Sequence, residues 1–389
     1  MKIGCCLAYY KNHNNYGTSL QGYALVKVLQ SLGHDVRIIK YQKRDIWTRR
    51  MSDAPLKLIS GGYQAYLRRI RKQLKNRGNS TYAQGIRVRT DVNNRFKDVH
   101  MEPLCDNYIG YAALQAASLR YDAVLVGSDQ VWTPLGLYSN FYNLNFVVDS
   151  VRRISYASSF GVSSIPWWQR KATGRYLNRI HFLSVREIKG KEIVEELSDN
   201  KATVVCDPTL LRSRTEWEKE LKEVAPIVEV PYIFCYILGN NAQMRSEITE
   251  FAKSKGLKIV ALRHIDEYLR CDDGFGDIAP YDVNPLDFVQ LIRNARYVFT
   301  DSFHATVFSI IFNRQFLTFY RYNSKSKNSR NSRIDSLFAL LGISGRLYDG
   351  NINMIDEPIE YESVNEQLLA LREKSKQFLI QALSPFVDE

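Results

Sequence analysis

The chain has 389 residues, of which 45% are hydrophobic and 24% are charged. These proportions are those of an ordinary globular protein, and no apolar run approaches the roughly 18–20 residues that a membrane-spanning helix needs. The formal net charge is +12, yet 17 Lys and Arg side chains and only three acids lie between Arg37 and Lys97. This block carries +14 by itself, which favours an anionic partner: nucleic acid, anionic lipid headgroups or a phosphorylated substrate.

The six cysteines are scattered and form no C-x-x-C pair, so neither a zinc site nor a redox motif is indicated. Most of them lie inside apolar runs, as free buried thiols do. The first residues, MKIGCCLAYYKNHNNYG, have an apolar run too short for a secretory signal and are typical of a first buried strand. We therefore expect a cytoplasmic protein without a bound metal.

The chain opens with a β-α-β pattern. A strand is expected at Lys2–Tyr9, a polar loop at Asn12–Ser19, an apolar-periodic helix at Leu20–Leu32 and a second strand at Asp35–Tyr41. This order predicts a doubly wound domain with a parallel sheet, and it places the polar loop at the carboxyl end of the first strand. Further strands are expected at Tyr121–Val126, Arg153–Ala157, Phe182–Arg186 and Ala202–Cys206.

A basic insert, residues 42–97, interrupts this domain. Its stretch Gly62–Gly78 places tyrosines and aliphatic residues on one helical face and basic residues on the rest, including Arg68, Arg69, Arg71 and Lys72. Such a helix can lie on an anionic membrane surface, or it can pack on its own domain with a solvated basic face. No helix-turn-helix, zinc finger or RNP motif accompanies the charge, so a nucleic-acid partner is not expected.

A second α/β series follows a charged segment with two prolines, Pro226 and Pro231. We therefore predict domains at 1–225 and 226–350, with a helical tail at 351–389. Strands of the second domain are expected at Tyr232–Leu238, Lys258–Leu262, Tyr297–Thr300 and Gln315–Phe319. The sequence thus predicts an α/β protein with two Rossmann-like domains facing a cleft and a C-terminal helix.

Three strand ends carry polar residues that could face this cleft. Asp129 is a candidate general base or hydroxyl ligand, or it bonds only to its own loop. Arg186 suits bidentate binding of phosphate or carboxylate, or it pairs with a neighbouring acid. The turn Asp301-Ser302-Phe303-His304 precedes an apolar helix, so it could bind an anion and offer a proton from His304, or simply cap the helix.

The loop 322–333 is basic and rich in serine and asparagine, and it includes Arg333. This composition indicates either a lid over a bound anion or a disordered surface loop. No G-x-G-x-x-G or Walker motif is present, so the motifs do not support nucleotide binding.

The chain resembles the polysaccharide pyruvyl transferase family. The similarity runs through NNYGTSLQGYAL, GSDQVW, ISYASSFG, SVRE, VVCDPTLL, PLDFVQLIRNARYVFTDSFHATVFSIIFNRQF and NSRIDSLFALLG, in this order. The resemblance implies a GT-B-like fold. It also implies transfer of the enolpyruvyl carbons of phosphoenolpyruvate to two hydroxyls of a sugar, which gives a pyruvate ketal without any other cofactor.

The family histidine falls on His304, which the resemblance makes a phosphoenolpyruvate ligand and a proton donor. Ser302 stands where many members have arginine, so the anion is expected to be bound by Arg186, by Arg333 or the loop 322–333, or by Ser302 and helix N–H groups. The family glycine of this motif is Thr306, which is expected to narrow the approach to the backbone.

The acceptor side of the expected site lies in the first domain. Asp129 is expected to act as base or clamp for the acceptor hydroxyls, with Asn15, Gly17 and Gln21 orienting the sugar. The acceptor implied is a lipid-linked oligosaccharide at the inner face of the cytoplasmic membrane, which would suit the basic insert. Two other functions stay open: a nucleotide-sugar-dependent GT-B glycosyltransferase and a noncatalytic carbohydrate- or lipid-binding regulator.

Overall fold

The computed structural model describes residues 1–389 except 10, 44–79, 135–139, 265–266, 322–330 and 385–389. The predicted basic helix, with Arg68, Arg69, Arg71 and Lys72, therefore lies outside the described residues, as does most of the loop 322–333. Among the described helices, none has the length and apolar character needed to cross a membrane.

The first sheet has seven parallel strands in the order β3-β2-β1-β4-β5-β6-β7. The strands are β1 (Lys2–Cys6), β2 (Asp35–Gln42), β3 (Cys105–Ile109), β4 (Ala123–Val126), β5 (Arg152–Ser158), β6 (Phe182–Val185) and β7 (Thr203–Val204). The helices of this half are α1 (Tyr16–Ser31), α4 (Ser80–His100), α5 (Tyr111–Ala117), α6 (Trp167–Leu177), α7 (Ile188–Leu197), α8 (Pro208–Leu211) and α9 (Arg214–Glu220). The central strands are buried on both faces, as expected of a parallel sheet covered by helices.

The second sheet has four parallel strands in the order β11-β10-β8-β9. They are β8 (Tyr232–Tyr236), β9 (Lys258–Ala261), β10 (Tyr297–Thr300) and β11 (Gln315–Thr318). The helices that follow the junction are α10 (Ala242–Lys255), α11 (Pro285–Asn294), α12 (Phe303–Ile311), α13 (Ser332–Leu341) and α14 (Tyr361–Leu383). Two Rossmann-like sheets with a C-terminal helix form the predicted α/β, GT-B-like fold.

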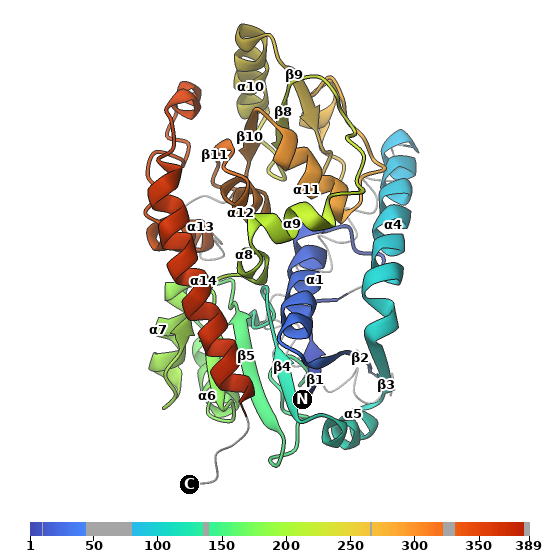
Figure 1. Cartoon of the computed structure of the whole chain (residues 1–389), viewed down its shortest axis with the longest axis vertical. Coiled ribbons are helices and arrows are strands. Elements are labelled where there is room, and N and C mark those ends of the chain that lie inside the picture. Colours follow the sequence, from blue (N-terminus) through green and yellow to red (C-terminus); the bar gives the residue numbers. More distant parts are fainter. Residues whose placement is uncertain (10, 44–79, 135–139, 265–266, 322–330, 385–389) are drawn as a thin grey trace.

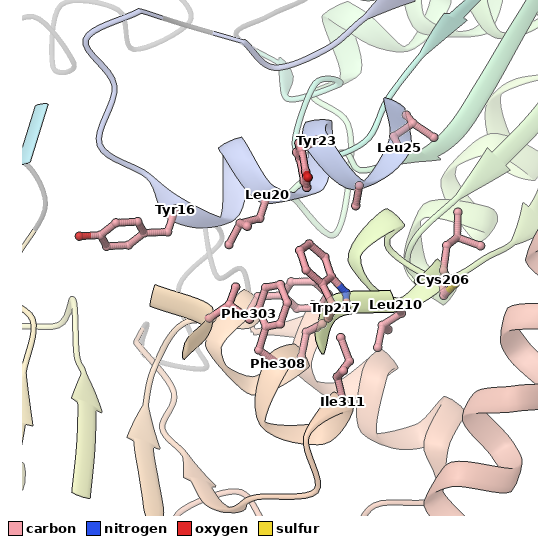
Figure 2. Packing of buried hydrophobic residues seen from close by; sticks show 14 of the residues in the cluster. Tyr16, Leu20, Tyr23, Leu25, Cys206, Leu210, Trp217, Phe303, Phe308 and Ile311 are labelled. Carbon is pink, nitrogen blue, oxygen red and sulfur yellow. The ribbon is translucent and has the colours of Figure 1, made fainter. Parts of the chain in front are cut away.

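One hydrophobic core joins the two halves. Trp217 of α9 is fully buried and lies between Tyr23 of α1 and Phe308 of α12, with ring centroids 6.4 and 5.0 Å away (Figure 2). Tyr16, at the start of α1, stacks on Phe288 of α11 at 4.7 Å. Because α1 belongs to the first sheet and α11 and α12 to the second, this packing fixes the relative position of the two halves.

Helix α14 runs alongside both sheets (Figure 1). It packs against α13 and α8, and its residue Arg372 donates a hydrogen bond to the Leu210 carbonyl at 2.8 Å. Near its end, the Ala382 carbonyl accepts a hydrogen bond from Arg152 of β5 at 2.9 Å. The predicted tail helix therefore contributes to the core of both halves.

Several element boundaries differ from the sequence-based expectations. Helix α1 begins at Tyr16, four residues before the expected start, because Asn15 caps it by accepting a hydrogen bond from the Thr18 N–H at 3.2 Å. Strand β3 was not predicted, and the sequence indicates a helix only over residues 89–99, so α4 is longer than predicted at both ends. Both elements lack a clear apolar period: β3 is a partly exposed strand, and the buried face of α4 includes Arg89, Asn93 and Lys97.

Candidate active site

Each sheet has a point where the strand order reverses. In the first sheet the chain moves one way from β1 through β2 to β3 and the other way from β4 to β7. In the second sheet β9 and β10 lie on opposite sides of β8. Ligands of open α/β sheets bind in the crevice at the carboxyl ends of the strands that flank such a point.

The loops that follow these four strands line one cavity of about 320 Å³. Its wall includes His13, Asn15 and Thr18 after β1, Asp129, Gln130, Val131 and Thr133 after β4, Leu238 after β8, and Ser302, Phe303 and His304 after β10. Ala8, Tyr142, Arg321 and Arg333 complete it. The two switch points therefore face one shared cavity, which is the first candidate for the active site.

His304 lies in the first turn of α12, where the cavity meets the core. Its side chain is buried, and its Nε2 atom is 3.6 Å from Asp207 Oδ2. The opposite edge of the ring lies against Gly17 of α1: a Cβ atom at position 17 would come within 2.0 Å of His304 Nδ1. Glycine is therefore required at position 17 for the ring to lie where it does.

Asp129 faces His304 from the end of β4. Its Oδ2 atom accepts a hydrogen bond from the Thr18 hydroxyl at 3.0 Å. Burial opposes its ionisation most strongly, but the neighbouring basic side chains Arg186, His304 and Arg333 hold the pKa of the Asp129 carboxyl below its ordinary value. Asp129 is therefore a carboxylate at neutral pH and can accept a hydrogen bond from a hydroxyl group.

The backbone before Asp129 depends on one glycine. Gly127 has φ = +134°, and a Cβ atom there would lie 1.9 Å from the Tyr156 carbonyl oxygen. Asp129 itself has φ = +69°, a region that aspartate tolerates better than most residues. The small-residue opening of this turn, Gly127-Ser128, thus allows Asp129 to point into the cavity.

Arg186 does not face the cavity, and the prediction that it does is wrong. Only 3% of its side chain is exposed. Its Nη1 atom donates to Asp207 Oδ2 at 2.7 Å, its Nη2 atom is 3.6 Å from Asp129 Oδ1, and its guanidinium stacks on the Phe303 ring at 4.5 Å. Two carboxylates and an aromatic ring hold Arg186 beneath the cavity wall, because a buried guanidinium needs paired acids.

Gln21 does not line the cavity wall, so the prediction that its side chain contacts the acceptor sugar is wrong. The side chain is fully buried. Its Nε2 atom donates to the Thr18 carbonyl at 3.0 Å, and its Oε1 atom accepts from the Ser128 N–H at 3.2 Å. Gln21 therefore joins α1 to the end of β4. Asn15 does line the cavity. Gly17 does not line it, but its missing side chain leaves the space that the His304 ring occupies.

Two arginines line the cavity near His304. Arg333, at the start of α13, lies over the outer part of the site with its guanidinium 5.6 Å from the Phe303 ring centroid. Arg321 was not predicted. Its Nη2 atom donates to the carbonyl of Asp301 at 2.9 Å and to Oδ1 at 3.1 Å. The signal for Arg321 was its place just after β11, the strand that neighbours β10.

The turn before α12 combines structural and open groups. The Asp301 carboxylate accepts hydrogen bonds from the N–H groups of Leu238 and Gly239 at 2.9 and 2.7 Å, so it ties β8 to β10. Ser302 lines the cavity at the N-cap position, yet its hydroxyl caps none of the N–H groups of the described first turn. Those N–H groups and the positive end of the helix dipole favour an anion.

Thr306, which replaces the family glycine, does not narrow the cavity. Its side chain is fully buried, and its hydroxyl lies 2.9 Å from the Thr318 hydroxyl of β11. It also donates to the Ser302 carbonyl at 3.1 Å. Thr306 therefore fills the space between α12 and β11 and lies outside the cavity wall, so the expectation that it narrows the site is wrong.

Comparison with known protein families assigns the chain. The family model for polysaccharide pyruvyl transferase matches residues 15–324. The protein belongs to the polysaccharide pyruvyl transferase family. The match begins at the Asn15 cap of α1 and continues past β11, so it includes Asp129, Ser302 and His304 and the strands that position them.

No curated protein sequence matches this pyruvyl transferase family member. Among solved structures it is similar to the UDP-GlcNAc 2-epimerase from Methanocaldococcus jannaschii (13% identity, TM-score 0.49, covering 96% of this chain and 92% of that one). It is also similar to a putative UDP-N-acetylglucosamine 2-epimerase from Listeria monocytogenes (10% identity, TM-score 0.49, covering 99% of this chain and 91% of that one). A third similar structure is the ADP-heptose heptosyltransferase II of E. coli (11% identity, TM-score 0.38, covering 97% of this chain and 100% of that one). Its fold assignment is based on the two parallel sheets themselves.

Proposed function

We propose that this protein transfers the pyruvyl group of phosphoenolpyruvate to two hydroxyls of a sugar, forming a ketal during polysaccharide biosynthesis. The observation that carries the proposal is the shared cavity in a member of this family. It brings His304, a group able to donate a proton, opposite the Asp129 carboxylate, with Arg321, Arg333 and a helix N-terminus in the same wall.

The donor end of the site is the wall formed by the second half of the chain. Phosphoenolpyruvate carries a carboxylate and a phosphate, and the planar fork of arginine binds both geometries. Because Arg186 is buried outside the cavity wall whereas Arg321 and Arg333 line it, we assign these anions to Arg321, Arg333 and the N–H groups at the start of α12, with Ser302 beside them. In this arrangement Arg321 and Arg333 stand in for the arginine that many family members have at position 302.

The reaction needs three proton transfers and two new C–O bonds. His304 donates a proton to the vinyl carbon C3, and the C2=C3 electron pair becomes the new C–H bond. The positive charge that develops at C2 is met by the first sugar hydroxyl, and the second hydroxyl attacks C2 as the bond from C2 to the phosphate oxygen breaks. Of the two hydroxyl protons, one restores His304 and the other leaves with inorganic phosphate.

The acceptor end of the site is the wall formed by the first half of the chain. The Asp129 carboxylate accepts a hydrogen bond from an acceptor hydroxyl and raises its nucleophilicity. Thr18 holds this carboxylate in place at 3.0 Å, while Asn15 lies on the same wall. Asp129 therefore acts on an acceptor hydroxyl, whereas His304 first protonates the enol carbon and then accepts a hydroxyl proton.

A binding experiment separates this function from its two alternatives. Isothermal titration calorimetry should detect phosphoenolpyruvate binding, and Arg333→Met should weaken it by about 10–100-fold, as expected for the loss of charge-assisted hydrogen bonds of ~1.5–3 kcal/mol. Arg296→Met, which removes an exposed arginine outside the cavity, is the matched control. Binding of UDP- or GDP-sugars in place of phosphoenolpyruvate, or of glycans alone, would overturn the proposal.

The proposed acceptor is a lipid-linked oligosaccharide at an anionic membrane. The support is the excess of basic residues between Arg37 and Lys97. Reversal of Arg68, Arg69, Arg71 and Lys72 to Glu should weaken binding to vesicles that contain anionic lipid, as should added salt. Replacement of the three arginines by lysine preserves the charge and is the control. Vesicle binding that neither salt nor reversal affects would contradict this acceptor.

A further inference from the structure

We infer that Asp207 is a positioning residue that holds the Nε2–H tautomer of His304, so that Nδ1 is the atom that exchanges protons with the substrates. The orientation of the ring follows from contacts within the chain. The step through Nδ1 rests on the function proposed above.

The Asp207 carboxylate has a fixed orientation. Its Oδ1 atom accepts hydrogen bonds from the Thr209 N–H at 3.0 Å and from the Thr209 hydroxyl at 2.7 Å. Its Oδ2 atom accepts from Arg186 Nη1 at 2.7 Å and from the Ser128 hydroxyl at 3.4 Å. The side chain is fully buried. Every described donor around Asp207 thus holds the carboxylate in one orientation, and Oδ2 faces His304.

Asp207 is ionised in this environment. Burial opposes its charge most strongly, but His304, Arg186 and Thr209 together hold the pKa of the Asp207 carboxyl well below its ordinary value. An ionised carboxylate can only accept hydrogen bonds, so the His304 nitrogen that faces it must carry a proton.

The two nitrogens of His304 have different surroundings. Nε2 is fully buried, and no hydrogen-bond partner reaches it among the described residues, although Asp207 Oδ2 is 3.6 Å away. Nδ1 lies over Gly17 in the first turn of α1, and Asn15 and Thr18, which lie close to Gly17 in the chain, line the cavity together with His304. The 3.6 Å separation exceeds a hydrogen bond, and catalytic contacts of this kind often tighten when substrate binds.

This arrangement assigns the proton transfers to one atom. With Nε2–H directed at Asp207, the imidazolium presents Nδ1–H to the cavity and the neutral ring presents the Nδ1 lone pair. Nδ1 can then give its proton to C3 of phosphoenolpyruvate and afterwards accept one from the sugar hydroxyl. Asp207 stabilises the ring in both states without contacting either substrate, as the buried carboxylate of a serine-protease triad does for its histidine.

Nitrogen-15 NMR of the wild-type protein tests the tautomer directly, since protonated and unprotonated imidazole nitrogens resonate far apart. The His304 signals are identified by their loss in His304→Gln, and the spectrum is recorded at a pH where the ring is neutral. We expect the proton on Nε2 and the lone pair on Nδ1. A neutral His304 with its proton on Nδ1 would overturn the inference, whatever the protein's substrate.

Turnover of phosphoenolpyruvate tests the consequence. Asp207→Asn should lower kcat by about 10²–10⁴-fold, because the ring is then held in the wrong tautomer, while KM changes little. The same substitution should shift the proton of the neutral His304 ring from Nε2 towards Nδ1, which the nitrogen-15 spectrum would show. Glu187→Gln removes another buried carboxylate near Arg186, 3.8 Å from its Nε atom, and should retain activity.

These measurements distinguish two failures. A wild-type protein that does not turn over phosphoenolpyruvate contradicts the proposed function but leaves the NMR result valid. A folded Asp207→Asn protein with unchanged kcat and unchanged tautomer contradicts the inference alone. If Asp207→Asn does not fold, the wild-type spectrum still decides between the two tautomers.

Discussion

Helices α1 and α12 meet along two faces that differ in almost every physical property. One face is packed solid: Leu20 and Tyr23 of α1 face Phe308 of α12, with Trp217 between them (Figure 2). The other face is hollow and charged, with Thr18 and His304 on the wall of the 320 Å³ cavity. The same two helices therefore join the halves of the chain and carry the candidate chemistry.

The difference shows what each face contributes. The apolar face is densely packed, and this packing fixes how α12 lies against α1. A cavity created there would therefore lower the stability of the fold. The polar face leaves space, and its side chains are held by hydrogen bonds and ion pairs that originate in the surrounding core. Substitutions on the cavity face should thus affect turnover, whereas substitutions on the packed face should affect stability.

The largest effect is expected at His304. His304→Gln should lower kcat by about 10²–10⁴-fold, because general acid–base groups contribute on that order. The midpoint of thermal unfolding should stay close to that of the wild type, since the ring makes no close hydrogen bond in the described structure. Steady-state kinetics and calorimetry check the two parts, with His34→Gln as a control outside the cavity. A His304→Gln protein that is strongly destabilised but fully active would contradict the assignment of His304 to the cavity face.

A substitution on the packed face should reduce stability strongly and turnover only slightly. Trp217→Ala should lower the free energy of unfolding by about 3–5 kcal/mol, the usual loss for a large buried aromatic side chain. Denaturant unfolding measures this loss, and the exposed Trp167, changed to Ala, serves as the control. Residual folded protein should keep a turnover much nearer to wild type than His304→Gln does. A small loss of stability would show that α9 is not part of the joint.

Gly17 lies at the boundary between the two faces. Gly17→Ala would place a Cβ atom 2.0 Å from His304 Nδ1, so the ring must move. A displacement of about 1 Å at a reacting group can cost 10²-fold, and we expect kcat to fall by roughly 10–100-fold. Gly22→Ala in the same helix is the matched control, because its Cβ would meet the flexible end of Met101 at 3.2 Å and Leu7 Cδ1 at an ordinary contact distance of 3.5 Å. Equal kinetics for the two variants would contradict the placement of the ring.

The smallest effect is the acid dependence of stability. The pKa values of Asp129 and Asp207 are both held below the ordinary value of about 3.9 for aspartate. Their contribution to stability is therefore complete above the pKa of the unfolded chain and is lost as the pH falls below it. Urea unfolding between pH 6 and pH 3 should show a shallower decline in Asp207→Asn than in the wild type. Identical slopes would mean that Asp207 is not ionised in the fold.

Much of the fold could be predicted from the sequence. The strands β1, β4, β8 and β10 are short apolar runs that end in polar turns, so both their existence and the side of the sheet that carries polar residues were evident. Strand β3, which was missed, and helix α4, which is longer than predicted, are stabilised by polar contacts between segments far apart in the chain. For example, Arg89 donates to the carbonyl of Arg263 at 2.7 Å.

Part of the site could be predicted from the sequence, but the directions in which its buried side chains point could not. Asp129, Ser302, His304 and Arg333 line the cavity as expected. The local sequence gives no sign that Arg186 turns inward, because its partner Asp207 follows a different strand and the pairing exists only in the folded chain. The role of Asp207 was hidden for the same reason.

The proposed reaction can be tested directly by incubating the wild-type protein with phosphoenolpyruvate and a panel of galactosides, mannosides and lipid-linked glycans. Released phosphate and the mass of the glycan product are measured together. One acceptor should gain a pyruvate ketal in a 1:1 ratio to released phosphate, and His304→Gln should abolish nearly all of both. Phosphate release without glycan modification, or ketal formation that persists at the wild-type rate in His304→Gln, would contradict it.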